Sequence, residues 1–119
     1  MSNYWIKPVI DYYKIFFGDV ADIVIDVGTR DGDDAFLIQN ELNSKYIYAI
    51  DAREEAANET KNKYPDFNVF HTAISDFMGT TSFCSVVSED KDYSGSSSIY
   101  NYKFKRKEYA HEIIEVPVT

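Results

Sequence analysis

Apolar and polar residues along the 119-residue chain are arranged so that strands and helices are expected to alternate. Short apolar runs predict buried strands, and apolar residues spaced three or four positions apart predict helices that pack along one side. Gly18 ends the first predicted helix, and Pro65 follows the third. The predicted helices span 8–17, 34–43 and 53–63; the predicted strands span 22–27, 46–51, 67–72, 80–87, 99–104 and 112–118, with a loop at 88–98.

This alternation predicts an α/β fold, a Rossmann-like open sheet that is mainly parallel. Because connections between parallel strands are right-handed, the first three strands are expected in the spatial order three, two, one. The strands predicted after residue 79 are expected to add antiparallel pairs, beginning with a hairpin partner for 80–87. The chain length suits a single domain, residues 1–119.

A glycine-bracketed turn follows the first predicted strand. That strand ends at an acid, Asp26, and the turn runs from Gly28 to Gly32. Asp33 or Asp34 is expected to cap the helix that follows. Strand, glycine turn and helix in this order form ligand sites at the carboxyl end of a first parallel strand.

The second predicted strand ends at another acid, Asp51, 19 residues after Gly32. That separation suits an acid that binds the hydroxyls of a ribose from the neighbouring strand. An aspartate such as Asp51 at the end of a strand is more often simply exposed to solvent. It indicates a ligand site only together with the glycine turn. The two features together predict a ligand that contains adenosine.

The charges around the turn indicate which adenosine ligand this is. The middle of the turn holds Arg30 rather than glycine, and Asp26 and Asp31 flank it. Each carboxylate would repel a pyrophosphate by roughly 1 kcal/mol or more. S-adenosylmethionine instead carries an ammonium and a sulfonium, so the pattern favours this methyl donor over a nicotinamide cofactor. Arg30 is either a clamp for the ligand carboxylate or an exposed loop residue.

Five blocks of sequence resemble the FkbM-type S-adenosylmethionine-dependent methyltransferases, over about residues 23–119. These blocks are Ile25-Asp26-Val27-Gly28 with Gly32; Ala49-Ile50-Asp51-Ala52; His71-Thr72-Ala73-Ile74-Ser75-Asp76 with Gly79 and Thr81-Ser82-Phe83; Gly95-Ser96-Ser97-Ser98-Ile99; and Glu115-Val116-Pro117-Val118-Thr119.

This resemblance implies a Rossmann-related enzyme that O-methylates hydroxyls of sugars or other small molecules, with S-adenosylmethionine as the cofactor. It implies no particular general base in this chain. Asp76 would accept from the adenine amine or, equally, cap a turn. The cofactor-binding residues implied by the resemblance and the turn are Asp26, Gly28, Thr29, Arg30, Gly32, Asp51, Ala52, Ser75 and Asp76.

The chain departs from the family pattern at three places. Thr29-Arg30-Asp31 stands where the family has Ala-Asn-x, and Asp51 stands where the family usually has Glu. The family continues past Val-Pro-Val-Thr into a strand of the form Lys-Ile-Asp-x-Glu-Gly, whereas this chain ends at Thr119. We therefore expect a truncated domain that lacks the half completing the substrate pocket. The alternative function is a non-catalytic binder of the donor or a protein-interaction module.

Composition excludes several other classes of protein. Hydrophobic residues at 45% argue against disorder, and a net charge of −8 argues against nonspecific nucleic-acid binding. Basic and aromatic residues alternate over 99–107, where a charged edge strand is an equally good explanation. The single cysteine, Cys84, and the absence of a long apolar run predict a cytoplasmic protein without membrane spans. His71 and His111 are isolated, so no metal site is predicted.

The first strand is expected at an open edge of the sheet, because no fourth parallel strand follows. Ile23, Val24 and Ile25 would then lie on that edge. Exposed apolar edges are templates for pairing with another strand. We expect either the late strands of the same chain or a second copy, in a homo-oligomer, to cover it.

Overall fold

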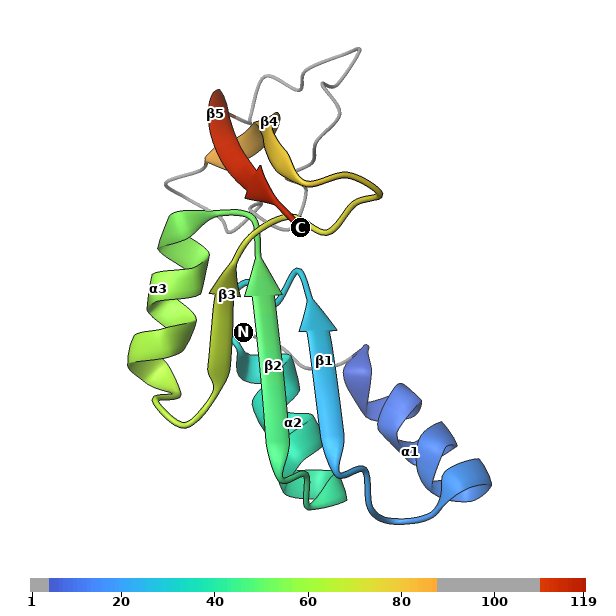
Figure 1. Ribbon diagram of the computed structural model, residues 1–119. Coiled ribbons are helices and arrows are strands. Elements are labelled where there is room, and N and C mark those ends of the chain that lie inside the picture. The colour runs from blue at the N-terminus through green and yellow to red at the C-terminus, as the bar shows by residue number, and fades with distance from the viewer. Residues whose placement is uncertain (1–4, 88–109) are drawn as a thin grey trace.

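The computed structural model describes residues 5–87 and 110–119 of the chain (Figure 1). Within these ranges, no helix combines the length and the apolar composition needed to cross a membrane. The predicted loop 88–98 and strand 99–104 lie outside the described residues. The elements are α1 (Ile6–Phe17), β1 (Ile23–Val27), α2 (Asp33–Leu42), β2 (Tyr46–Asp51), α3 (Glu54–Lys63), β3 (Asn68–His71), β4 (Gly79–Val87) and β5 (Ala110–Val118).

The first three strands form a parallel sheet in the order β1-β2-β3, as predicted. Asp26 lies opposite Ala49, and Asp51 lies opposite His71, so the acidic strand ends meet at one edge of the sheet. β4 and β5 form a separate antiparallel pair, which confirms the predicted hairpin partner for 80–87. The α/β, partly Rossmann-like fold is therefore present, and element ends differ from the predicted ones by at most two residues.

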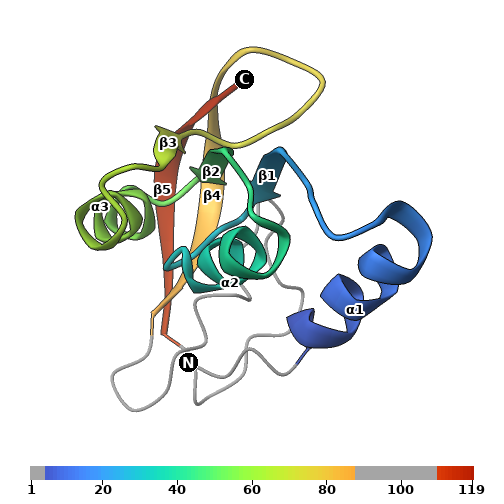
Figure 2. The same ribbon diagram turned by 90° about the horizontal axis from the view of Figure 1, so that it is seen from below.

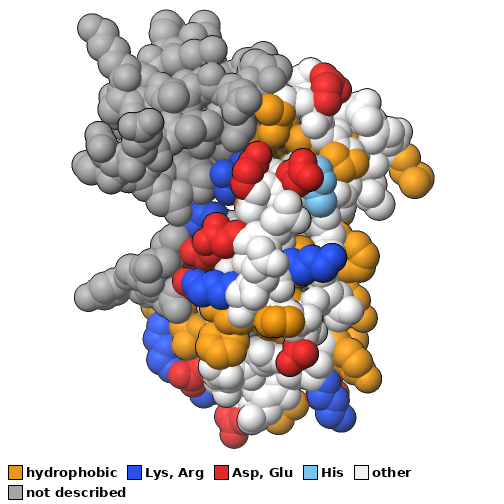
Figure 3. All heavy atoms as spheres, turned by 90° about the vertical axis from the view of Figure 1, so that its left-hand side faces the viewer, with side chains coloured by type: hydrophobic (Ala, Val, Ile, Leu, Met, Phe, Trp, Pro, Cys, Tyr) orange, Lys and Arg blue, Asp and Glu red, His pale blue; other side chains and the backbone are white. Residues whose placement is uncertain are grey.

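α2 and α3 cover one face of the parallel sheet (Figure 2). Two alanines with no exposed surface, Ala35 of α2 and Ala49 of β2, allow the helix and the sheet to approach closely in a core that includes Val24, Ile47 and Phe67. α3 contributes only small buried residues, and its outward residues are polar. Figure 3 shows this side of the molecule, where acidic and basic side chains are interspersed with apolar ones.

The antiparallel pair attaches beyond the carboxyl end of β3. Ala73 forms a parallel bridge with Val118, and the backbone of Thr119 donates to the Ala73 carbonyl at 2.8 Å and accepts from the Ser75 amide at 3.1 Å. A second core cluster joins Ala52 and Ala73 to residues of the hairpin. β5 therefore lies next to the segment that follows β3, and β1 is at the other edge of the parallel sheet.

The outer edge and one face of β1 remain uncovered in the described part of the chain. Ile23, Ile25 and Val27 are 59%, 65% and 61% exposed, whereas Val24 between them is buried. β1 pairs with β2, and the described late strands pair with each other and with Ala73 instead. The expectation that the described late strand β5 covers this edge is therefore wrong, because its pairing lies at the β3 side. Pairing with a second copy stays a prediction.

We expect the chain to self-associate through β1. Replacing Ile25 with Lys places a charge on the exposed face and should lower the association constant at least about tenfold without unfolding the monomer. Sedimentation velocity across a concentration series measures the association. A chain that stays monomeric throughout, with rapidly exchanging amides at residues 23–26, would contradict the prediction.

Candidate functional site

The glycine turn is tied to the end of β2 by backbone hydrogen bonds. The amides of Gly28 and Thr29 both donate to the Ile50 carbonyl, at 2.7 and 3.0 Å, and the Gly32 amide donates to the Thr29 carbonyl at 3.1 Å. Arg30 has a positive φ of 60°, which is strained for a residue with a side chain. The sequence thus builds a tight, well-anchored turn at the carboxyl edge of the sheet.

The two glycines of the turn have different surroundings, although both have φ near 80°. A Cβ on Gly28 would meet nothing within 4 Å. A Cβ on Gly32 would lie 2.8 Å from Thr60 Cγ2 and 2.8 Å from Tyr64 Cδ2 of the next helix and loop. Gly28 therefore leaves open space above the turn, whereas Gly32 lets α3 pack against it.

Asp51 holds the turn and the start of α3 together. Its Oδ2 accepts from the Arg30 amide and its Oδ1 from the Arg53 amide, both at 2.9 Å. The carboxylate is almost buried, with 7% of the residue exposed. Each carboxylate oxygen has a second lone pair, so Asp51 retains the capacity to accept from a ligand hydroxyl.

Asp26 presents an unpaired carboxylate oxygen at the end of β1. Its Oδ2 is buried and has no hydrogen-bond partner in the described part of the structure. Burial raises the pKa of Asp26, the charges of Asp51 and Asp31 raise it further, and the Thr29 side chain opposes the shift. Buried carboxylate oxygens are normally paired, so a buried oxygen without a partner is an unusual feature of this strand end.

Thr29 and Asp34 present two more buried oxygens without hydrogen-bond partners among the described residues, Oγ1 and Oδ1. Thr29 is only 5% exposed. The pKa of Asp34 is raised by burial and then by the charge of Asp26, while Arg30 acts in the opposite direction. Asp34 was not among the predicted ligand-binding residues. The sequence does place it in the first turn of the helix after the glycine turn, and that position could have suggested that it lies near Asp26.

The predicted capping of α2 by Asp33 or Asp34 is wrong. The helix begins at Asp33 with Gly32 as its N-cap residue, and the Asp33 amide donates to Asp31 Oδ1 at 3.0 Å. Asp33 Oδ1 instead accepts from Lys63 Nζ at 2.6 Å and from the Tyr64 hydroxyl at 2.5 Å. The acid before the helix, not the acids within it, satisfies the free amide.

The other predicted cofactor-binding residues have no recorded hydrogen bond to the turn among the described residues. Ala52 is buried in the cluster with the hairpin. The Ser75 hydroxyl donates to Asp76 at 3.3 Å, and both side chains are exposed. The structure thus brings Asp26, Gly28, Thr29, Arg30, Gly32 and Asp51 together. Ala52 and Ser75 instead contact the β4–β5 pair and the residue after it, and Asp76 contacts Ser75.

His71 serves a structural contact in this fold. Its Nε2 donates to the Ala52 carbonyl at 3.0 Å, which fixes the end of β3 against the loop after β2. Across the residues that the structure describes, no group of three or more His, Cys, Asp or Glu side chains is arranged to hold a metal ion.

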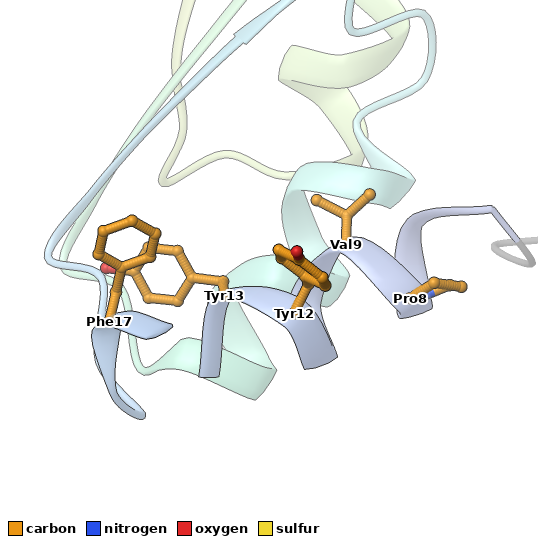
Figure 4. Close-up of a pocket in the computed structure, with 5 residues that line it drawn as sticks. All are labelled: Pro8, Val9, Tyr12, Tyr13 and Phe17. Carbon is orange, nitrogen blue, oxygen red and sulfur yellow. The ribbon is translucent and has the colours of Figure 1, made fainter. Parts of the chain in front are cut away.

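A separate hollow of about 520 Å³ lies along α1 (Figure 4). Its lining is almost entirely apolar, and the Tyr13 hydroxyl donates to the Val20 carbonyl at 3.2 Å. None of the five residues that line the hollow carries a carboxylate or a basic group. The lining residues are Pro8, Val9, Tyr12, Tyr13 and Phe17.

Comparison with known proteins connects the chain to methyltransferases. It is 35% identical over 57 residues to a protein of Methanococcus maripaludis described as a probable cobalt-precorrin-6B C(15)-methyltransferase (decarboxylating). The matched region is 48% of this chain and 30% of the relative, so the chain spans under a third of that protein. No protein-family model matches the chain, and no solved structure matches it significantly.

This match and the fold support a relationship to S-adenosylmethionine-dependent methyltransferases as a class. The match does not single out the FkbM type.

Proposed function

We propose that the chain binds S-adenosylmethionine at the carboxyl ends of β1 and β2 and takes part in methyl transfer to a hydroxyl of a small molecule or sugar. The observation that supports this most directly is the buried, unpartnered Asp26 carboxylate oxygen beside the open space at Gly28. A ligand with a cationic group would occupy that space and pair with the carboxylate. Nearly buried Asp51 stands at the end of the adjacent strand, where ribose hydroxyls can reach its free lone pairs.

When bound, the donor would supply its sulfonium methyl group: the carbon–sulfur bond would break as the acceptor oxygen bonds to the methyl carbon, S-adenosylhomocysteine would leave, and the hydroxyl proton would pass to water. The task of this chain's residues is to orient the donor. Asp26 and Gly28 hold one end of it at β1, and Asp51 holds the other at β2, with the turn between them fixed by hydrogen bonds to Ile50. Such alignment is a large part of the rate enhancement in transfer reactions.

Calorimetric titration of the full chain with S-adenosylmethionine and S-adenosylhomocysteine tests the proposal. We expect micromolar dissociation constants. Asp51→Ala should weaken binding of both ligands at least about tenfold, because it removes the ribose acceptor and also frees the two amides that set the turn.

Asp66→Ala is the matched control, since Asp66 is an exposed acid near the opposite end of the sheet. It should bind like the wild type. Folded wild-type protein that binds neither ligand would overturn the proposal, as would equal affinities for the Asp51 and Asp66 variants. Thermal unfolding of each variant establishes that it is folded at the titration temperature.

A further inference from the structure

The face of the parallel sheet opposite α2 and α3 is bare in the described part of the chain (Figure 2). Side chains alternate along a strand, so the neighbours of buried Val24 and Ile47 point to this other face. In the paired register the face contains no Asp, Glu, Lys or Arg. Parallel sheets are normally covered by helices on both faces, so this face lacks a layer. Its most exposed members, each about half exposed or more, are Ile23, Ile25, Val27, Tyr46 and Phe70.

α1 has two apolar sides, and only one of them is packed. Ile6 and Ile10 are buried against α2. Val9, Tyr12 and Phe16, spaced three and four positions apart, form an exposed outer side, on which the Tyr12 and Phe16 rings lie 4.7 Å apart between centroids. The charged side chains of α1 pair with one another or with an acid of α2. The outer side is therefore an apolar helix surface without a partner among the described residues.

We propose that these two surfaces meet between two copies of the chain. The outer side of α1 in each copy (Val9, Tyr12 and Phe16) covers the bare sheet face of the other copy. α1 lies on the outer side of β1 in Figures 1 and 2, so a two-fold axis near β1 forms the helix-on-sheet contact twice. This contact differs from the pairing of β1 edges, which involves no residue of α1, and it does not depend on donor binding.

The exposed area and the charge of the chain both favour a second copy as the occupant. Aromatic side chains bury about 150–250 Å² each when covered, so the half-exposed side chains of the two surfaces offer roughly 800 Å² per copy. That is about what each partner contributes to an interface of standard size, and more than a monomer usually exposes in one patch. Because each copy has a net charge of −8, two copies repel where acids approach one another. The two uncharged surfaces allow association without that repulsion, and one chain supplies both the sheet and the helix.

Opposite charges placed on the two surfaces test this contact. Tyr12→Glu charges the outer side of α1 and Ile25→Lys charges the sheet face, and each alone should lower the association constant at least about tenfold. An equimolar mixture of the two variants should associate at least about threefold more tightly than either variant alone. The reason is that a mixed dimer has one unaltered contact and one in which the two new charges are opposite in sign. Sedimentation velocity across a concentration series measures all three samples.

Asn58→Lys and Asn58→Glu are the matched controls, because they add the same charges to an exposed position of α3. Both should associate like the wild type, and thermal unfolding establishes that every variant is folded. Unchanged association of Tyr12→Glu, or a mixture that associates no better than its components, would overturn the helix-on-sheet contact while leaving the pairing of β1 edges in place. A wild type that stays monomeric at every concentration would overturn both. If that monomer bound phosphatidylcholine vesicles and Tyr12→Glu did not, the outer side of α1 would belong to a lipid surface instead.

Discussion

Gly32→Ala is expected to lower the free energy of unfolding by roughly 3 kcal/mol or more, a large share of the about 5–15 kcal/mol that stabilises a typical domain. The new Cβ would lie 2.8 Å from Thr60 Cγ2 and from Tyr64 Cδ2. Neither neighbour can withdraw easily, because Thr60 has no exposed surface and the Tyr64 ring stacks at 4.8 Å on both Phe36 and Phe67. Overpacking costs about 1–3 kcal/mol, and a positive φ costs a similar amount without glycine.

Gly28→Ala is the matched comparison, because its φ of 81° is nearly that of Gly32 but its Cβ would meet nothing within 4 Å. Gly28→Ala should lower the free energy of unfolding by about 1 kcal/mol, which is the cost of the positive φ without any steric clash. Denaturant unfolding of both variants measures the difference. Similar losses for the two would show that Tyr64 and Thr60 do not constrain the turn.

Gly28→Ala should nevertheless reduce ligand affinity, since the space above Gly28 is where the proposed ligand lies. The two glycines are indistinguishable in the sequence, where both simply bracket a turn. Only the structure distinguishes them: Gly32 packs against Thr60 and Tyr64, whereas Gly28 has no neighbour within 4 Å of where its Cβ would lie.

The sheet could be predicted from the sequence because each parallel strand is a short apolar run bounded by a turn or helix. Val24, Ile47 and Ala49 fall in such runs and are all buried. The position of β5 could not be predicted, because its pairing with β4 and Ala73 depends on long-range contacts that leave no local pattern. For that reason β5 does not provide the cover for β1 that was one of the two expected alternatives.

The candidate site was predictable in part for the same physical reason. Parallel strands bring their carboxyl ends together, so Asp26 and Asp51 were expected to adjoin, and their charges do interact. The roles of individual groups were not predictable. Asp51 accepts from two backbone amides, and one carboxylate oxygen of Asp34 is buried; both facts depend on the three-dimensional packing of the turn and the helices.

An unpaired acid in a ligand site has a consequence for stability. Burial and neighbouring acids raise the pKa of both Asp26 and Asp34 above the ordinary 3.8. The folded state therefore holds these protons more tightly than the unfolded state. Between pH 3.8 and the raised pKa values the folded chain binds more protons, so their contribution to stability falls as the pH rises. At pH values above both raised pKa values, this contribution to stability is fully lost and no longer changes with pH.

Asp26→Asn should therefore stabilise the ligand-free chain at pH 7 by about 1 kcal/mol, raising Tm by about 4 °C. The gain over wild type should shrink as the pH falls and vanish below 3.8, because the wild-type carboxyl is then protonated in both states. The difference between the two proteins is the quantity to follow. Burial opposes, but Lys63 and Tyr64 outweigh it and lower the pKa of Asp33. Its contribution to stability therefore falls as the pH falls, and it does so equally in the wild type and in the Asp26→Asn variant.

The same substitution should remove most of the stabilisation by ligand. S-adenosylhomocysteine at about 100 times its Kd stabilises a folded protein by about 2.7 kcal/mol, and a hundredfold loss of affinity reduces this to about 0.4 kcal/mol. Melting curves with and without ligand thus give two opposite changes from one variant. An Asp26→Asn chain that melts below wild type without ligand would mean that the Asp26 carboxylate is paired in solution. If Asp26 binds the ligand, the variant must show both a higher Tm without ligand and a smaller rise in Tm with ligand. The reason is that the charge that destabilises the empty site is the one that the ligand neutralises.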